Sequence, residues 1–182
     1  MDTLSHALWG KGLFGYRGYG KLAILFGTMP DLCSFGILGV VQIVTKEFSP
    51  GPPKIETIPD WIIFNYDITH SFVTAFICIY LVSRYNKNIA FAMLAWPFHI
   101  LLDFPFHSKE YFPTKLFYPL TNFSFDGIPW SNPEVWFPNI SGIIILFIYR
   151  FKTKNTYSDS SIDRIQGKWY NYNYFCLIII IN

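Results

Sequence analysis

The chain has 182 residues, of which 52% are hydrophobic, 20% aromatic and only 14% charged. Soluble domains carry about 25% charged residues, so this composition argues against an ordinary soluble protein and favours one membrane domain. The net charge of +2, without a basic run along one helical face, gives no support for nucleic-acid binding. Three widely spaced cysteines, Cys33, Cys78 and Cys176, form neither a disulfide framework nor a CxxC pair.

Five apolar segments organise the chain, and each predicts a helix because lipid cannot satisfy the polar backbone of an open sheet edge. They cover roughly residues 3–14, 21–45, 71–83, 88–104 and 136–149. The second is broken at Pro30 and Asp31. Several are shorter than the ~20 residues that cross a bilayer upright, which leaves each single span open. We predict an all-α, multi-pass transmembrane bundle of about five helices.

Two long connections separate these segments. Residues 46–67 contain four prolines, and residues 105–135 are rich in proline and aromatic residues. Such proline-dotted stretches predict irregular loops rather than helices. The membrane-embedded domain is expected over residues 1–151. Residues 152–182 then form a polar tail that ends in a short apolar stretch, which the pattern does not place.

The charges predict which side of the membrane each connection faces. The side with the turns at residues 15–20 and 84–87 and the tail holds ten Lys and Arg residues, counting those that flank these segments, against Asp159 and Asp163. The opposite side holds four lysines against eight acidic residues. Cytoplasmic loops are the ones rich in Lys and Arg. We therefore expect the turns and the tail in the cytoplasm and the two long loops outside, in a bacterial-type inner membrane. Chance scatter of a few charges is the alternative.

Ionisable side chains within the apolar segments are costly in a membrane, and their default interpretation is functional. Asp31, His99 and Asp103 lie inside such segments, and His6 and His70 begin two others. With a rise of 1.5 Å per residue, His70, His99 and Asp103 lie about 21, 18 and 24 Å from the turn at residues 84–87. Four segments therefore deliver these side chains to one layer in the outer half of the membrane.

Imidazole and carboxylate together suit zinc, manganese or iron rather than calcium. We predict a divalent metal site, with zinc as the first choice, that holds one ion, or two with Asp31 or Asp103 bridging. Its candidate ligands are His6, Asp31, His70, His99, Asp103 and His107. Judged singly, each has another explanation: a packed or capping histidine, a His99–Asp103 hydrogen bond, or Asp31 as a helix cap. All four histidines of the chain fall at or near one layer, and this favours the metal.

Four short motifs carry a resemblance to a known family: MDTLSH at residues 1–6, MPD at 29–31, THS at 69–71 and HILLD at 99–103. Their order resembles the YdjM-like inner-membrane metal-dependent hydrolases, and KLFYP at residues 115–119 resembles that family's downstream Trp/Tyr-Pro segment. The resemblance covers roughly residues 1–120. That family is similar to zinc-dependent phospholipases C and fungal single-strand nucleases, which are helical enzymes with clustered zinc ions.

The resemblance implies metal ligation by His6, Asp31, His70, His99 and Asp103. Two positions depart from it. Many relatives carry a second aspartate where this chain has Cys33, and a further histidine where it has Asn65. These departures put a second metal in doubt, although Cys33 is itself a possible ligand.

The expected activity is metal-assisted hydrolysis of a phosphoester or another ester, with a lipid head group as one possible substrate. A bound metal lowers the pKa of water and polarises the ester. Asp67 and Asp126 are the predicted catalytic proton acceptors because they flank the site, and Lys109 or Lys115 is expected to contact a phosphate. No Ser-His-Asp order, G-x-S-x-G motif or glycine-rich phosphate loop is present.

Two alternatives come from other functional classes. A transporter or channel could pass protons or metal ions along the His and Asp side chains. It would need polar residues that continue to the cytoplasmic side, and the third and fourth segments offer few beyond Thr74 and Ser83. The other alternative is a non-catalytic membrane protein with packed histidines. The expected partner in every case is the lipid bilayer.

Overall fold

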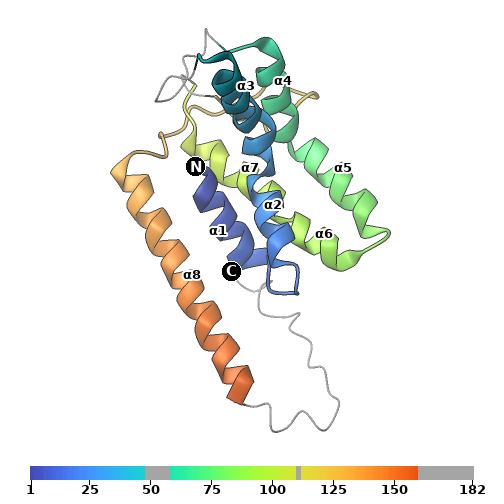
Figure 1. Cartoon of the computed structure of the whole chain (residues 1–182), viewed down its shortest axis with the longest axis vertical. Helices are drawn as coiled ribbons and strands as arrows, with labels where there is room; N and C mark the ends of the chain where they lie inside the picture. The colour runs from blue at the N-terminus through green and yellow to red at the C-terminus, as the bar shows by residue number, and fades with distance from the viewer. Residues whose placement is uncertain (48–57, 110–111, 160–182) are drawn as a thin grey trace. The chain divides into compact units, whose positions relative to one another are not determined.

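The computed structural model describes residues 1–47, 58–109 and 112–159, and this described part of the chain is helical without strands (Figure 1). The predicted all-α class is therefore confirmed for these residues. Residues 48–57, which hold three of the four prolines of the first long connection, and the tail beyond residue 159 lie outside the described residues. The chain divides into two compact units, Met1–Phe147 and Ile148–Asn182. The described part of the second unit is the end of helix α8.

Helices α1 (Thr3–Phe14) and α2 (Gly20–Asp31) form a close antiparallel pair. Asp2 caps α1, because its side chain accepts from the Ser5 backbone N–H at 2.8 Å. Where the helices cross, a Cβ on Gly27 would lie 2.6 Å from the carbonyl oxygen of His6. Because Gly27 has no side chain, the backbones of α1 and α2 can lie in direct contact here. This contact fixes His6 beside the end of α2.

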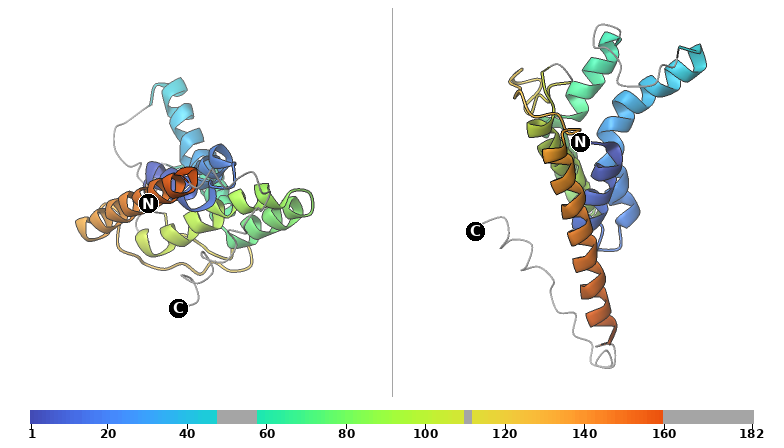
Figure 2. Two further views of the ribbon diagram at one scale, coloured as in Figure 1. Left: turned by 90° about the horizontal axis from the view of Figure 1, so that it is seen from below. Right: turned by 90° about the vertical axis from the view of Figure 1, so that its left-hand side faces the viewer.

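The predicted break at Pro30 and Asp31 is a change of helix type. A π-helix (Leu32–Gly36) follows α2 and continues into α3 (Ile37–Thr45). Proline lacks an N–H and disturbs the regular hydrogen-bond ladder, and Ser34 Oγ donates to the Pro30 carbonyl oxygen at 2.9 Å. Despite this disturbance, the helical run from Gly20 to Thr45 is continuous over 26 residues. Both views of Figure 2 show α3 projecting away from α1.

Helix α4 (Asp60–Thr69) corrects the prediction that residues 46–67 form an irregular loop throughout. The four prolines of this stretch all precede residue 60, and Pro59 is the N-cap of α4, where its missing N–H costs no helical hydrogen bond. Helix α5 (Phe72–Ser83) follows and is bent by 55° from α4. Ser71 caps α5 by accepting from the Val73 backbone N–H at 3.1 Å.

The fourth apolar segment is two helices, α6 (Lys87–Met93) and α7 (Ala95–Phe106). Pro97 cannot donate to the carbonyl of Met93, and this explains the turn at Leu94 between them. The second long loop is shorter than predicted, because Pro105 lies within α7 and Pro133 begins α8 (Pro133–Asp159). Helix α8 also continues beyond residue 151, where a polar tail was expected.

Three helical stretches are long and apolar enough to cross a membrane: Gly20–Thr45, Lys87–Phe106 and Pro133–Thr153. The bent pair of α4 and α5 passes the same test as one unit. Helix α1 has only 12 residues and is not among them. Large apolar side chains on these stretches are exposed, such as Val44 at 75% and Ile145 at 66%, which is typical of a surface that faces lipid. The described helices thus indicate membrane association.

Candidate metal centre

Four ligand-type side chains from three parts of the fold meet in the interior. Asp31 ends α2, His70 lies between α4 and α5, and His99 and Asp103 lie one turn apart on α7. All four are buried, and one ligand atom from each lies within 4.8 Å of the others. We call this group the primary cluster. Its two imidazoles and two carboxylates could hold a metal ion.

Backbone carbonyls fix the orientation of both imidazoles in the primary cluster. His99 Nδ1 lies 2.7 Å from the Gly27 carbonyl oxygen, and His70 Nδ1 lies 3.0 Å from that of Tyr66. A carbonyl oxygen only accepts, so each Nδ1 carries its hydrogen. In the neutral ring, each Nε2 then presents a lone pair to the cluster. Metal-binding histidines in proteins are held by this same arrangement.

Among the described residues, no Lys, Arg or amino-terminal group forms an ion pair with the facing atoms of the primary cluster. The two Nε2 atoms of His70 and His99 are 3.1 Å apart. His99 Nε2 lies 2.9 Å from Asp103 Oδ2, which is buried and accepts no hydrogen bond. Two nitrogens bound to one tetrahedral zinc ion at ~2.0 Å would be about 3.3 Å apart, close to the observed spacing. The spacing of these ligand atoms thus fits a divalent cation.

A second group forms on the other oxygen of Asp103. His6 Nε2 lies 2.9 Å and His107 Nε2 3.4 Å from Asp103 Oδ1. The Met1 amino group forms an ion pair with the same oxygen and lies 3.2 Å from His107 Nε2. We call His6, His107 and Asp103 Oδ1 the secondary cluster. The cationic Met1 amino group already lies among these ligand atoms. Asp103 is shared by both clusters.

The two clusters are stacked and supported from neighbouring elements. His6 stacks on His99 with ring centroids 3.6 Å apart, and its buried Nδ1 has no hydrogen-bond partner. Thr3 Oγ1 donates to Asp31 Oδ2 at 2.7 Å, which leaves Asp31 Oδ1 facing the primary cluster. This oxygen lies 3.7 Å from Nε2 of both His70 and His99.

A backbone clamp holds His107 beyond the end of α7. The Gly127 N–H donates to the His107 carbonyl oxygen at 2.9 Å, and the Ile128 N–H donates to that of Pro105 at 3.0 Å. A Cβ on Gly127 would overlap the Pro105 carbonyl, so only glycine fits this approach. Burial lowers the pKa of His107 to about 4. Its ring is therefore neutral near pH 7, as a metal ligand requires.

The two predicted catalytic carboxylates have hydrogen-bond partners outside these clusters. Asp67 Oδ2 accepts from Lys115 Nζ at 2.6 Å. Lys115, which was expected to contact a phosphate, is therefore already paired with Asp67. Asp126 Oδ1 accepts from the Lys109 backbone N–H at 2.8 Å on an exposed loop. Among the described residues, no hydrogen bond or ion pair joins either carboxylate to the six candidate ligands. Their role as proton acceptors stays a prediction.

Sequence reasoning missed three supporting residues: Thr3, the carbonyl of Gly27, and Tyr66. Tyr66 precedes His70 by four residues, which places both on one helical face, and this spacing was the available signal. The two positions that depart from the resembled family lie side by side, since Asn65 Nδ2 donates to the Cys33 carbonyl oxygen at 3.4 Å. Neither belongs to the primary cluster.

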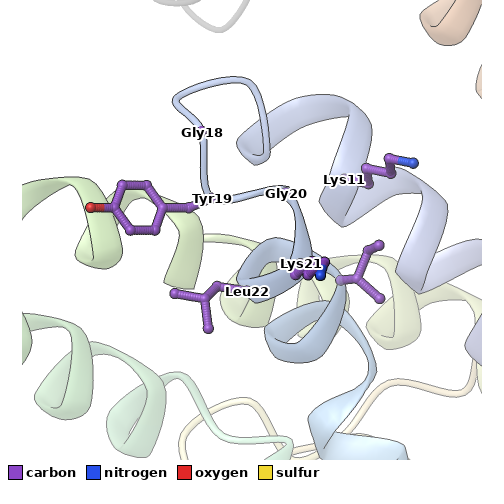
Figure 3. Close-up of a pocket in the computed structure, with 7 residues that line it drawn as sticks. Lys11, Gly18, Tyr19, Gly20, Lys21 and Leu22 are labelled. Carbon is purple, nitrogen blue, oxygen red and sulfur yellow. The ribbon is translucent and has the colours of Figure 1, made fainter.

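A hollow of about 400 Å³ lies at the turn between α1 and α2, lined by residues that include Lys11, Tyr19 and Lys21 (Figure 3). It sits at the end of these two helices opposite to His6 and Asp31. None of its lining residues is His, Cys, Asp or Glu. The candidate metal ligands therefore lie elsewhere, in the packed interior.

No protein-family model, curated protein or solved structure matches the chain. The resemblance to YdjM-like hydrolases therefore stays a prediction from the motifs.

Proposed function

We propose that this chain is a membrane-bound, metal-dependent hydrolase that acts on a phosphoester or another ester. The observation that carries the proposal is the pair of Nε2 lone pairs, 3.1 Å apart, beside two buried carboxylates. Asp31, His70, His99 and Asp103 would hold the metal ion. A bound divalent ion, zinc first with manganese or iron as alternatives, would lower the pKa of water and polarise the ester.

Apolar packing below the primary cluster favours hydrolysis over transport. One turn from His99 towards the start of α7 lies Trp96, and Met93 and Ala75 pack with it in a buried apolar core. A path for protons or ions would need polar groups at this depth. At this depth the Trp96 side chain is instead fixed against the end of α4, since its Nε1 donates to the Thr69 carbonyl oxygen at 2.6 Å.

We further propose that the chain is a YdjM-like multi-pass bundle of about five helices in a bacterial-type inner membrane. The four motifs and the charge asymmetry support this proposal. The three apolar stretches and the bent α4–α5 pair would cross in alternating directions, with α1 entering from the outer side. The two long loops and the metal centre would then lie towards the outer face, where a lipid head group is within reach.

The enzymatic proposal is tested on detergent-purified protein stripped with a chelator and reloaded with zinc, manganese or iron. We expect at least one ion per chain by mass spectrometry. We also expect metal-dependent cleavage in a screen of phosphomonoesters, phosphodiesters and carboxylic esters, with the His99→Ala variant as the inactive control. A folded protein that binds no metal would overturn the proposal. Stoichiometric metal without turnover on any ester would favour the transporter.

The topology is tested separately with reporter fusions. A reporter fused after Tyr85 or Lys154 should be cytoplasmic, and one inserted near Pro53 or Trp130 should be outside. The physical reason is retention of Lys- and Arg-rich segments on the cytoplasmic side. Accessibility labelling of single cysteines at the same positions provides an independent measurement. If the Pro53 and Tyr85 reporters report the same side, the bent α4–α5 pair does not cross the membrane.

A further inference from the structure

We infer that Thr3 is a positioning residue that makes Asp31 bind the metal through one oxygen and so keeps one coordination position of the ion open for water or substrate. This inference rests on the proposed function. The two residues come from different helices, since Thr3 begins α1 and Asp31 ends α2. The Thr3 hydroxyl donates to Asp31 Oδ2 at 2.7 Å, because an ionised carboxylate only accepts.

The packing of α1 against α2 brings this hydroxyl to this carboxylate. The two antiparallel helices approach each other closely at two places that are about one turn apart. A Cβ on Gly10 would lie 2.6 Å from the Ala23 carbonyl oxygen, and a Cβ on Gly27 would lie 2.6 Å from that of His6. One turn further in the same register, the first turn of α1 lies opposite the end of α2. The contact is therefore fixed by helix packing and does not depend on a loop.

The side of the primary cluster at Asp31 is the side where a further ligand can approach the ion. The Asp31 side chain is 11% exposed, whereas those of His70, His99 and Asp103 are at most 1% exposed. Asp31 Oδ1 lies 3.7 Å from both imidazole Nε2 atoms. The ligand atoms of the other three residues lie 2.9–3.5 Å from one another. These three form the closed, buried part of the cluster, and Asp31 forms its open edge.

The number of donor atoms shows why the second oxygen of Asp31 matters. Zinc binds four donor atoms and can expand to five. With one atom from each ligand, the primary cluster supplies four and leaves the fifth position for water or substrate. If Asp31 Oδ2 also bound the ion, the protein itself would fill all five positions. The hydrogen bond from Thr3 opposes this, because it holds Oδ2 towards α1.

The test is a Co²⁺ titration of the full-length, chelator-stripped protein in detergent, with azide as the probe of the open position. Visible absorption reports how many donor atoms surround the Co²⁺ ion, and mass spectrometry reports the metal content. Azide should change the spectrum of Co²⁺-loaded wild type. Thr3→Val keeps the shape of the side chain and removes the hydroxyl. It should bind Co²⁺ roughly 10-fold more weakly, as expected on loss of a partner that orients a metal ligand, and its spectrum should no longer respond to azide.

Two further variants and a control separate the hydroxyl from other effects of substitution. Thr3→Ser keeps a hydroxyl and should restore both the Co²⁺ affinity and the response to azide. Thr3→Ala also removes the hydroxyl and should behave as Thr3→Val, so it replaces that variant if Thr3→Val does not fold. Thr45→Val is the matched control and should change neither measurement. The Thr45 hydroxyl donates to the Val41 carbonyl oxygen at 3.1 Å on the exposed end of α3.

The outcomes distinguish this inference from the proposed function. A response to azide in Thr3→Val or Thr3→Ala that equals the wild-type response would overturn the inference. Co²⁺-loaded wild type that does not respond to azide would also overturn it, while leaving the primary cluster intact as a metal site. Wild type that binds no metal would overturn the proposed function as well. The expected metal and azide binding without turnover on any ester would support the role of Thr3 and contradict the hydrolase.

Discussion

The His99→Ala/Asp103→Ala double variant should bind metal more than about 100-fold more weakly than wild type. Loss of a residue that merely supports a metal ligand costs roughly 10–100-fold in affinity, and this variant removes two ligands outright. One is an imidazole whose lone pair points into the primary cluster. The other is the carboxylate that both clusters share. Metal content after chelation and reloading, measured by mass spectrometry, checks the prediction.

Thermal unfolding gives a second measurement on the same samples. A ligand at 100 times its Kd stabilises the folded state by about 2.7 kcal/mol, so metal should raise the Tm of wild type and leave the Tm of the double variant unchanged. His107→Ala should keep the ion of the primary cluster. Cys78→Ala, a partly buried substitution on α5, is the control and should retain all metal. Full occupancy in a double variant with normal helical circular dichroism would rule out the site.

The depth of the candidate ligands was open to sequence reasoning because an α-helix has a fixed rise per residue. Distances along the helices were measured from the tight turn at residues 84–87, so the depths of His70 and His99 in the membrane could be compared before any contact was known. Their Nε2 atoms lie 3.1 Å apart in the structure. The turn at Leu94 does not upset this depth estimate, because α6 and α7 together still form one stretch of 20 residues.

Helix α4 was not predicted because the effect of a proline on the residues before it was also assumed for the residues after it. A proline interrupts a helix through its missing N–H and its clash with the preceding turn, and neither effect reaches forward from Pro59 into residues 60–69. Counting prolines over a 20-residue stretch hid this asymmetry. The consequence was functional, since α4 carries Tyr66 and thus the contact with His107.

Pairs between distant residues could not be predicted from spacing. Asp67 seemed free along the sequence, yet Lys115 approaches it from 48 residues away. The orientation of His99 likewise depends on the Gly27 carbonyl, 72 residues distant. Such contacts follow from how helices pack, and that packing is set at a few positions where backbones touch. Gly27 is one of them, because it meets α1 through its missing side chain and α7 through its carbonyl.

Gly27→Ala should therefore destabilise the protein and weaken its metal site together. The new Cβ would lie 2.6 Å from the His6 carbonyl oxygen and 3.3 Å from the attached carbon, so a backbone must move. Overpacking of this kind costs roughly 1–3 kcal/mol. A shift of α2 also moves the carbonyl that holds His99 Nδ1, and we expect roughly 10-fold weaker metal binding as a result.

Gly39→Ala on α3 is the matched control for this prediction. A Cβ there meets nothing within 4 Å, and alanine is favoured over glycine in a helix by roughly 0.5–1 kcal/mol. Gly39→Ala should therefore keep or raise the unfolding temperature in detergent and leave metal affinity unchanged. If Gly27→Ala matches Gly39→Ala in both measurements, the α1–α2 contact does not position the metal centre. Loss of stability with unchanged metal affinity would separate the two roles of Gly27, and would show that His99 keeps its orientation without that carbonyl.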